Sequence, residues 1–296
     1  MKKKQIIGIL LIVLIIFFLI TNLIYAQNYK DFNFNKWVQN EQNAKLYNYF
    51  TSRAEQSNSW YIDFQRNLDD KDKLTPKQRD NRVKWIFKYA YKLNYMAPKY
   101  HPRRIAKDYF WILEHEANFV NYWNTDDGQS FGVTQVTWRV TQAASDKFGD
   151  NFNIYKNKNT TGNLQYDPKL RKYYNPNHRT YLRQNPEFQI KYGLWYAYKL
   201  MSKYYPEDRL TAWTGYNVGP GLNKWQAKVT FKQYGKIVTK YKSFRKKESA
   251  KNWAENIKKN YKNAIIIIGE APRFRNYYFI IRGKITYGEE QMQKIK

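Results

Sequence analysis

The sequence contains no cysteine. This absence excludes disulfide bridges, thiolate-bound metals, a cysteine nucleophile and the lipid-modified cysteine of a lipoprotein anchor, and it leaves the redox compartment open. Histidine is also scarce, because the chain has only 3 and their spacing is not that of metal ligands. We therefore expect neither a metal site nor a cofactor.

Acidic residues are few compared with basic ones. The chain has 24 Asp and Glu against 52 Lys and Arg, which gives a formal net charge of +28. Such an excess indicates a strongly anionic partner: nucleic acid, anionic lipid or an acidic cell-wall polymer. Aromatic residues make up 19% of the chain, more than a core of this size needs, so we expect many rings at the surface or in a groove.

The N-terminal residues have the pattern of a secretory leader. "MKKK" precedes a long apolar run, and small residues follow it, with a possible cleavage site after Ala26. Residues 6–26 are also long enough to span a bilayer as an uncleaved anchor, so both alternatives stay open. Either one predicts export across the inner membrane, in periplasmic or membrane-anchored form. This disfavours nucleic acid as the partner and favours the cell envelope.

Apolar periodicity predicts a mainly helical chain. Helical spacing is clearest over residues 77–96, from Pro102 onward, over residues 186–205 and over residues 248–263, and "SFGVTQV" indicates a turn that runs into a helix. After the last of these helices, "AIIIIG" and "YYFIIRGKITYG" are rich in β-forming residues and predict a small β-prone tail.

The stretch "YFWILEHEANF" combines an apolar stripe with two glutamates. At helical spacing Glu116 falls in the middle of the stripe, whereas Glu114 falls on the opposite side, where an exposed carboxylate is expected. The stripe consists of Ile105, Tyr109, Ile112, Leu113, Phe119 and Val120. A carboxyl group on an apolar face is a candidate acid, because burial raises its pKa. From this helix alone, a buried Glu116 paired with Lys or Arg is an equally good interpretation.

Three segments occur in an order that is typical of a known family. "HPRRIAKDYFWILEHEANF", "SFGVTQV" and "LTAWTGYNVGPGLNKW" resemble the transglycosylase SLT domain of lytic transglycosylases, glycoside hydrolase family 23, whose lysozyme-like fold goose-type lysozymes share. The matching residues are Glu116 with Phe119, Gly132 with Gln135, and Tyr216, Asn217, Gly219 and Pro220. "ESAKNWAENIKKNY" is similar to the closing helix of that family, so the resemblance covers roughly residues 98–264.

The resemblance implies a substrate and a reaction. The substrate is peptidoglycan, an anionic glycan that suits a basic, exported, aromatic-rich chain. The implied reaction breaks the β-1,4 bond between N-acetylmuramic acid and N-acetylglucosamine, with Glu116 as the single acid and base. Glu116 protonates the glycosidic oxygen and then takes a proton from the muramic acid 6-hydroxyl, which leaves a 1,6-anhydro end.

The resemblance also implies substrate-binding residues. Tyr216 is expected to orient Glu116, Gln135 and Asn217 to hold N-acetyl or hydroxyl groups, and the backbone at Gly132 to permit close approach of the sugar. The sequence departs from the family pattern at neighbouring positions.

These departures concern the finer sugar contacts. Thr134 stands where the family usually has Met, and Ala117 where it has Ser. Asp126 occupies the place of a common Ser, so Ser130 becomes the nearest hydroxyl. Ser130 and Thr134 are therefore counted with the expected substrate contacts.

Two alternative functions stay open. If Asp126 or Asp127 positions a water, the enzyme is a hydrolytic muramidase of the goose-type kind, although "DDG" is more typical of a solvated turn. A non-catalytic protein that binds peptidoglycan or scaffolds an envelope assembly is the alternative from another class.

The predicted domain organisation has four parts. Residues 1–26 form the signal peptide or membrane anchor, 27–97 an N-terminal helical region, 98–264 the lysozyme-like domain, and 265–296 the β-prone tail. The expected partners are peptidoglycan strands and, if the leader is uncleaved, the membrane, with no nucleic acid and a monomeric chain.

Overall fold

The computed structural model describes residues 31–64, 74–117, 119, 130–152, 165–167, 172–174, 176–206, 208–218, 224–261 and 263–293. The predicted leader over residues 1–26 lies outside these ranges, as do Asp126, Asp127, Gly219 and Pro220. Among the helices of the described ranges, none combines the length and the apolar character needed to cross a membrane.

The chain divides into two compact units. The first lies within Met1–Lys199 and Gly288–Lys296, and the second within Leu200–Tyr287. The predicted boundaries after residues 97 and 264 stay predictions. Each unit has buried hydrophobic residues of its own.

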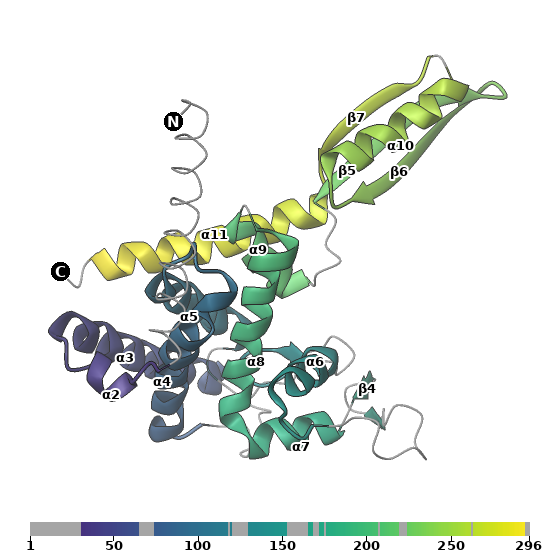
Figure 1. The fold of residues 1–296 in the computed structure, drawn as a ribbon. Helices are drawn as coiled ribbons and strands as arrows, with labels where there is room; N and C mark the ends of the chain where they lie inside the picture. The colour runs from purple at the N-terminus through teal and green to yellow at the C-terminus, as the bar shows by residue number, and fades with distance from the viewer. Residues whose placement is uncertain are drawn as a thin grey trace, which may run out of the picture. The chain divides into compact units, whose positions relative to one another are not determined.

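The first unit is a helical body with short hairpins (Figure 1). Its elements are α2 (Phe34–Trp37), α3 (Glu41–Phe64), α4 (Pro76–Lys92), η2 (Asn94–Met96), α5 (Pro102–Ala117), β1 (Ser130–Phe131), β2 (Val136–Thr137), α6 (Trp138–Phe148), β3 (Gln165–Asp167), β4 (Lys172–Tyr174), α7 (Pro176–Gln184) and α8 (Pro186–Lys199). Helix α4 is central, because it packs against α3, α5 and α8.

Aromatic rings fill the core between these helices. The ring of Phe50 from α3 stacks on Phe110 of α5 with centroids 4.1 Å apart, and it lies 5.9 Å from Phe87 of α4. All three side chains are fully buried. Burying one such ring stabilises the fold by roughly 1.5–3 kcal/mol, so this contact between three helices holds α5 firmly in the unit.

Local sequence signals determine where the helices start. Thr75 caps α4 in a capping box with Gln78, and Pro76 occupies the first turn. Thr137 caps α6, which ends at Gly149 in the left-handed conformation, with φ of 71°. The cap at Thr137 also fixes the point at which β2 passes directly into α6.

The second unit combines helices with a three-stranded antiparallel sheet (Figure 1). Its elements are η3 (Leu200–Tyr204, a π-helix), α9 (Arg209–Val218), β5 (Trp225–Gln233), β6 (Lys236–Phe244), α10 (Lys247–Asn260), β7 (Ile265–Glu270) and α11 (Pro272–Gln293), whose last turns belong to the first unit. The strand order is β6-β5-β7, and α10 covers one face of the sheet.

The β5–β6 hairpin has a two-residue turn. Gln233 pairs with Lys236, and the two residues between them, Tyr234 and Gly235, have φ of 49° and 78°. Two consecutive positive φ values are those of a type I′ turn, whose twist matches that of paired strands. We did not predict this hairpin from the sequence, although the alternation in "WQAKVTFK" and the "YG" pair are signals for it.

The mainly helical prediction is confirmed, and the strand predicted at "AIIIIG" is present as β7. The prediction of β structure for "YYFIIRGKITYG" is wrong, because this segment is part of α11. The buried residues Phe274, Ile281 and Ile285 of α11 recur at helical spacing, and Pro272 occupies the first turn of this helix. Packing of one helical face therefore overrides the β propensity of the segment.

Candidate active site

Helix α5 carries the candidate acid at its C-terminal end. The predicted apolar stripe is confirmed for its described residues, which are all fully buried: Ile105, Tyr109, Ile112, Leu113 and Phe119. Val120 lies outside the described ranges. Glu116 is the next-to-last residue of the helix, and its side chain is neither buried nor fully exposed. This glutamate is held by a rigid element and is only partly buried.

The chain leaves α5 through a fixed conformation at Phe119. This residue has φ of 56°, in the left-handed region, and its fully buried ring lies 4.8 Å from that of Phe110. A bulky residue adopts this backbone conformation only when its surroundings compensate for the strain. Burial of the ring supplies that compensation, so the last turn of α5 is anchored just beyond Glu116.

The expectation that Glu114 is exposed is wrong. Its side chain is 5% exposed, and Nε of Arg53 donates a hydrogen bond to its Oε1 at 2.7 Å. The guanidinium group of Arg53 also lies 5.9 Å from the ring of Trp111. The physical reason is that α3 packs against the side of α5 that was expected to face solvent, so both sides of α5 are covered.

The two glutamates therefore have different environments. Glu114 is a buried carboxylate neutralised by a cation from another helix, which is a structural role. Glu116 is the one that retains partial access to solvent. Periodicity identified Glu116 as unusual, but it could not identify Glu114 as an internal ion pair, because the partner lies 61 residues away.

The "SFGVTQV" segment contains the turn that the sequence indicated, and its flanking residues pair as a short hairpin. Phe131 pairs with Val136, and the four residues between them make the turn. The backbone N–H and the side-chain Nε2 of Gln135 both donate to the carbonyl oxygen of Gly132, at 3.1 and 2.7 Å. Gly132 and Gln135 have φ of 85° and 48°. The turn is thus closed twice by the same residue.

A side chain that sequence reasoning missed holds this turn in place. Gln189 of α8 is fully buried, accepts a hydrogen bond from the N–H of Val133 at 3.0 Å and donates one to the carbonyl of Leu182 at 3.0 Å. A Cβ atom on Gly132 would lie 2.2 Å from Oε1 of Gln189. Gly132 is therefore required both by its φ and by this close approach. A glutamine within the apolar "QIKYGLWYAY" helix was the available signal.

The side chains of the turn that were expected to contact the sugar are enclosed by protein. Ser130 is 4% exposed, Thr134 is fully buried and Gln135 is 8% exposed. The amide nitrogen of Gln135 is already engaged with Gly132. The expected sugar contacts by these side chains stay predictions, as does the proximity of the turn to Glu116.

The remaining expected residues lie on α9. Tyr216 is 8% exposed, and its ring makes an edge contact with Trp213, with centroids 6.1 Å apart. Asn217 is the next residue of the helix, and its side chain is outside the described part of the structure. Because α9 belongs to the second unit and Glu116 to the first, the role of Tyr216 in orienting Glu116 stays a prediction.

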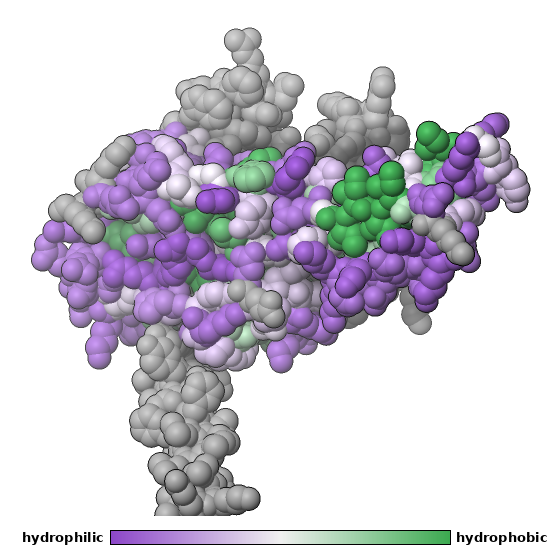
Figure 2. Space-filling model, turned by 90° about the horizontal axis from the view of Figure 1, so that it is seen from above, coloured by the Kyte–Doolittle hydropathy of each residue, from purple (hydrophilic) through white to green (hydrophobic). Residues whose placement is uncertain are grey.

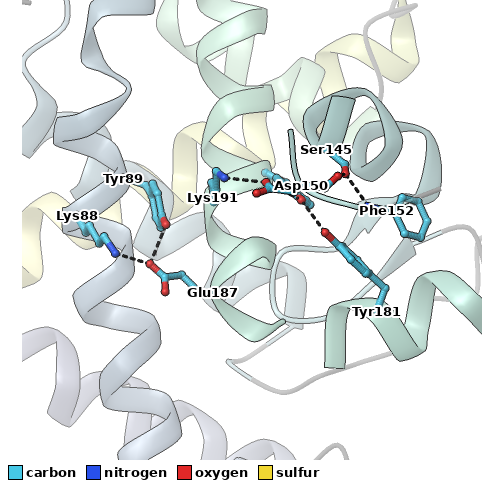
Figure 3. A network of polar contacts seen from close by, with 9 residues as sticks. Lys88, Tyr89, Ser145, Asp150, Phe152, Tyr181, Glu187 and Lys191 are labelled. Atoms are coloured by element: carbon cyan, nitrogen blue, oxygen red, sulfur yellow. Dashed lines mark hydrogen bonds and ion pairs between the residues drawn. The ribbon is translucent and has the colours of Figure 1, made fainter. Parts of the chain in front are cut away.

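Ion pairs on either side of Gln189 fix helix α8 (Figure 3). On one side, Oε1 of Glu187 accepts hydrogen bonds from Nζ of Lys88 at 2.5 Å and from the hydroxyl of Tyr89 at 2.7 Å. On the other side, Nζ of Lys191 donates to Oδ2 of Asp150 at 2.7 Å. The first pair joins α8 to α4, and the second joins it to the residues that follow α6.

Electrostatics in this network favour the charged form of Glu187 and the neutral form of Tyr89. Burial raises the pKa of Glu187, but hydrogen bonds from Lys88 and Tyr89 outweigh it, so this pKa lies below its ordinary value. Burial, together with the bond to Glu187, raises the pKa of Tyr89 and keeps it a neutral donor. The network therefore holds α8, and with it Gln189 and the turn, in one position.

Among the described residues, no group of three or more His, Asp or Glu side chains is arranged to hold a metal ion. Comparison with family models, curated proteins and solved structures finds no match to this chain. The fold and the site therefore define the class only as a mainly helical protein with a small sheet, and function has to be argued from the residues themselves.

Proposed function

We propose that this chain is a lytic transglycosylase of peptidoglycan, as its resemblance to the SLT domain implies. The observation that carries the proposal is the contrast between the two glutamates of α5. Glu114 is buried and paired with Arg53, whereas Glu116, one residue before the end of the helix, is only partly buried. An acid that must meet a polymer needs this combination of a rigid support and access.

Glu116 acts first as an acid and then as a base. A glycan strand lying over the end of α5 removes water from the carboxyl group, which favours the protonated form. Glu116 then gives its proton to the glycosidic oxygen as the bond to the departing sugar breaks. The resulting carboxylate takes the proton of the muramic acid 6-hydroxyl, whose oxygen closes onto the anomeric carbon. Protons balance, and no water is consumed.

The hairpin turn at Gly132 supports the proposal as a binding element. Its backbone is fixed by Gln135 from within and by Gln189 from α8. Hydrogen-bonding groups that are held before the substrate arrives lose little entropy on binding. In the proposed enzyme this backbone faces the N-acetyl groups of the glycan, and Tyr216 and Asn217 supply further contacts.

The charge of the chain agrees with this substrate. A formal net charge of +28 favours association with the acidic polymers of a cell wall, and attraction of this kind mainly raises the association rate. Residues 1–26, which carry the leader pattern, would place the enzyme in the envelope, where that polymer is found.

The test is mass spectrometry of the soluble products released from purified peptidoglycan. The unchanged protein is expected to release muropeptides with 1,6-anhydro-muramic ends, which are lighter by one water than reducing ends. Glu116→Gln is expected to release none. Glu114→Gln is the matched control, because it removes a carboxylate two residues away: it should lower stability and still yield the anhydro product.

Other outcomes identify the alternatives. Products with reducing ends, absent in Glu116→Gln, would make the chain a hydrolytic muramidase and bring Asp126 or Asp127 into the mechanism. No product from either protein, with binding to peptidoglycan retained, would favour a non-catalytic scaffold. If Glu114→Gln lost the product with its fold intact while Glu116→Gln kept it, the acid would be Glu114 and the assignment of Glu116 would be wrong.

A further inference from the structure

The sheet of the second unit has two unlike faces. On one face, Ala227, Val229 and Phe231 of β5 are buried against Ala250 and Ala254 of α10. Side chains alternate along a strand, so the intervening residues of β5, together with their neighbours on β6 and β7, point to the opposite face. We call this second surface the open face.

The open face displays large apolar side chains. Ile265 and Ile267 of β7 are 65% and 56% exposed, and Ile237 and Tyr241 of β6 are 79% and 59% exposed. Figure 2 shows a hydrophobic area on the surface of the part of the molecule that contains this sheet. At the tip of the hairpin, Tyr234 is 95% exposed. Apolar groups gathered in this way on one surface mark a site of interaction.

Residues 224–270 are strongly basic, and their lysines occur on both faces of the sheet. Residues 224–270 contain 13 Lys and Arg against three Glu. Glu248 and Glu255 lie on α10. Glu270 pairs with Trp225 and lies on the same face of the sheet as Ile266 and Ile268, which pack toward α10. Along the described strands β5, β6 and β7, the open face carries Lys228 and Lys232 and no acidic side chain.

We infer that the open face binds the surface of a lipid bilayer that contains acidic phospholipids. Exposed isoleucines enter the boundary between headgroups and acyl chains, Tyr241 lies at the headgroup level, and Lys228 and Lys232 meet the lipid phosphates. An acidic polymer would satisfy the lysines but not the aliphatic side chains, and an apolar protein surface would leave the lysines uncompensated. An anionic bilayer satisfies both.

The face is organised before any lipid binds. The ammonium group of Lys228 lies 5.7 Å from the ring of Tyr241 on the neighbouring strand, and the hydroxyls of Thr230 and Thr239 are 3.1 Å apart. Because paired strands fix these side chains, little conformational entropy is lost on contact with a membrane. The inference concerns the second unit alone and is independent of the reaction proposed for Glu116.

The absence of native cysteine makes a direct test possible in the full chain. A single cysteine replaces Thr239 on the open face or, as the matched control, the exposed Asn252 on α10, and each carries a polarity-sensitive fluorophore. The probe membranes are vesicles of phosphatidylcholine, alone or mixed with phosphatidylglycerol. Residues 1–26 can bring the protein to either kind of vesicle, but only insertion of the open face changes the environment at position 239.

With the mixed vesicles, we expect a blue shift at position 239 and quenching there by nitroxide-labelled lipid, with no change at position 252. Replacing Ile265 and Ile267 by Ser is expected to raise the lipid concentration for half-maximal shift at least tenfold. Lys228→Gln is expected to raise it about fivefold. Both changes leave the core under α10 intact, which an unchanged melting curve will verify.

Several results would overturn the inference. The label at position 239 could stay accessible to aqueous iodide while the protein is bound to vesicles, or both labels could shift equally. A shift without lipid that grows with protein concentration would mean that a second copy covers the face. A shift with peptidoglycan sacculi but not with vesicles would make the partner a wall polymer.

Discussion

Replacing Gly132 by Ala tests whether the hairpin turn is as constrained as its geometry indicates. Two costs are expected. The first is conformational, because φ of 85° is unfavourable for alanine by about 1–2 kcal/mol. The second is steric, because the new Cβ would lie 2.2 Å from Oε1 of Gln189. Gln189 must then move away and lose its hydrogen bonds to Val133 and Leu182, at about 1 kcal/mol each.

Together these terms predict that Gly132→Ala lowers the free energy of unfolding by about 3–4 kcal/mol. Gly149→Ala is the matched control, because Gly149 has φ of 71° and nothing lies within 4 Å of the position of its missing Cβ. This control carries the conformational cost only, about 1–2 kcal/mol. Urea unfolding followed by circular dichroism measures both variants against the unchanged protein.

A double-mutant cycle separates the two costs further. Gln189→Ala alone is destabilising, but in its presence Gly132→Ala should cost only the conformational term, which gives a coupling energy of about 2 kcal/mol. Equal destabilisation by Gly132→Ala and Gly149→Ala, with no coupling to Gln189, would refute the reasoning. The role of Gly132 would then be backbone conformation alone.

Further predictions concern the ionisable groups of the first unit. Arg53→Met leaves Glu114 buried without this cation and is expected to lower stability by about 2 kcal/mol, less than for a fully buried pair because Arg53 is 30% exposed. Adding Glu114→Leu should restore most of the loss in urea unfolding; an unchanged deficit would contradict the assignment. Burial lowers the pKa of His178 to about 3, from 6.5. The unfolded chain therefore binds the proton first, so stability is full above pH 6.5 and falls by about 1.4 kcal/mol per pH unit below it. His178→Asn should flatten this slope between pH 6 and 5, whereas His101→Asn, at a less buried position, should change it less; equal slopes in all three proteins would disprove the assignment.

Sequence periodicity predicted the helices but not their surroundings. The apolar stripe of α5 was correct because hydrophobic spacing directly reflects one buried face. The prediction that Glu114 is exposed was wrong because burial of the opposite face of α5 depends on α3, which comes from a distant part of the chain and packs there. Arg53 and Glu114 contact each other across 61 residues, and a single sequence holds no signal for such a pair.

In the candidate site, too, the sequence predicted local features of the chain but not contacts between distant residues. Spacing and resemblance singled out Gly132 and Gln135, whose φ values and mutual hydrogen bonds are local properties of the turn. Gln189 was missed, because its function is to connect that turn to α7 and α8 through two backbone groups. In α11 the local signal itself was misinterpreted. Its β-forming residues predicted a strand, and the helical spacing of the buried Phe274, Ile281 and Ile285 was overlooked.

The distribution of charge connects the two proposals. In the first unit, several carboxylates form ion pairs with basic side chains of the same unit: Glu114 with Arg53, Glu187 with Lys88, and Asp150 with Lys191. Each pair is neutral, so the formal net charge of +28 remains with the other groups of the chain. In the second unit, the three Glu of residues 224–270 lie away from the open face. Both units therefore present cations to their surroundings. An envelope with an acidic glycan beside an acidic membrane would supply the partner of each, so one location accounts for both.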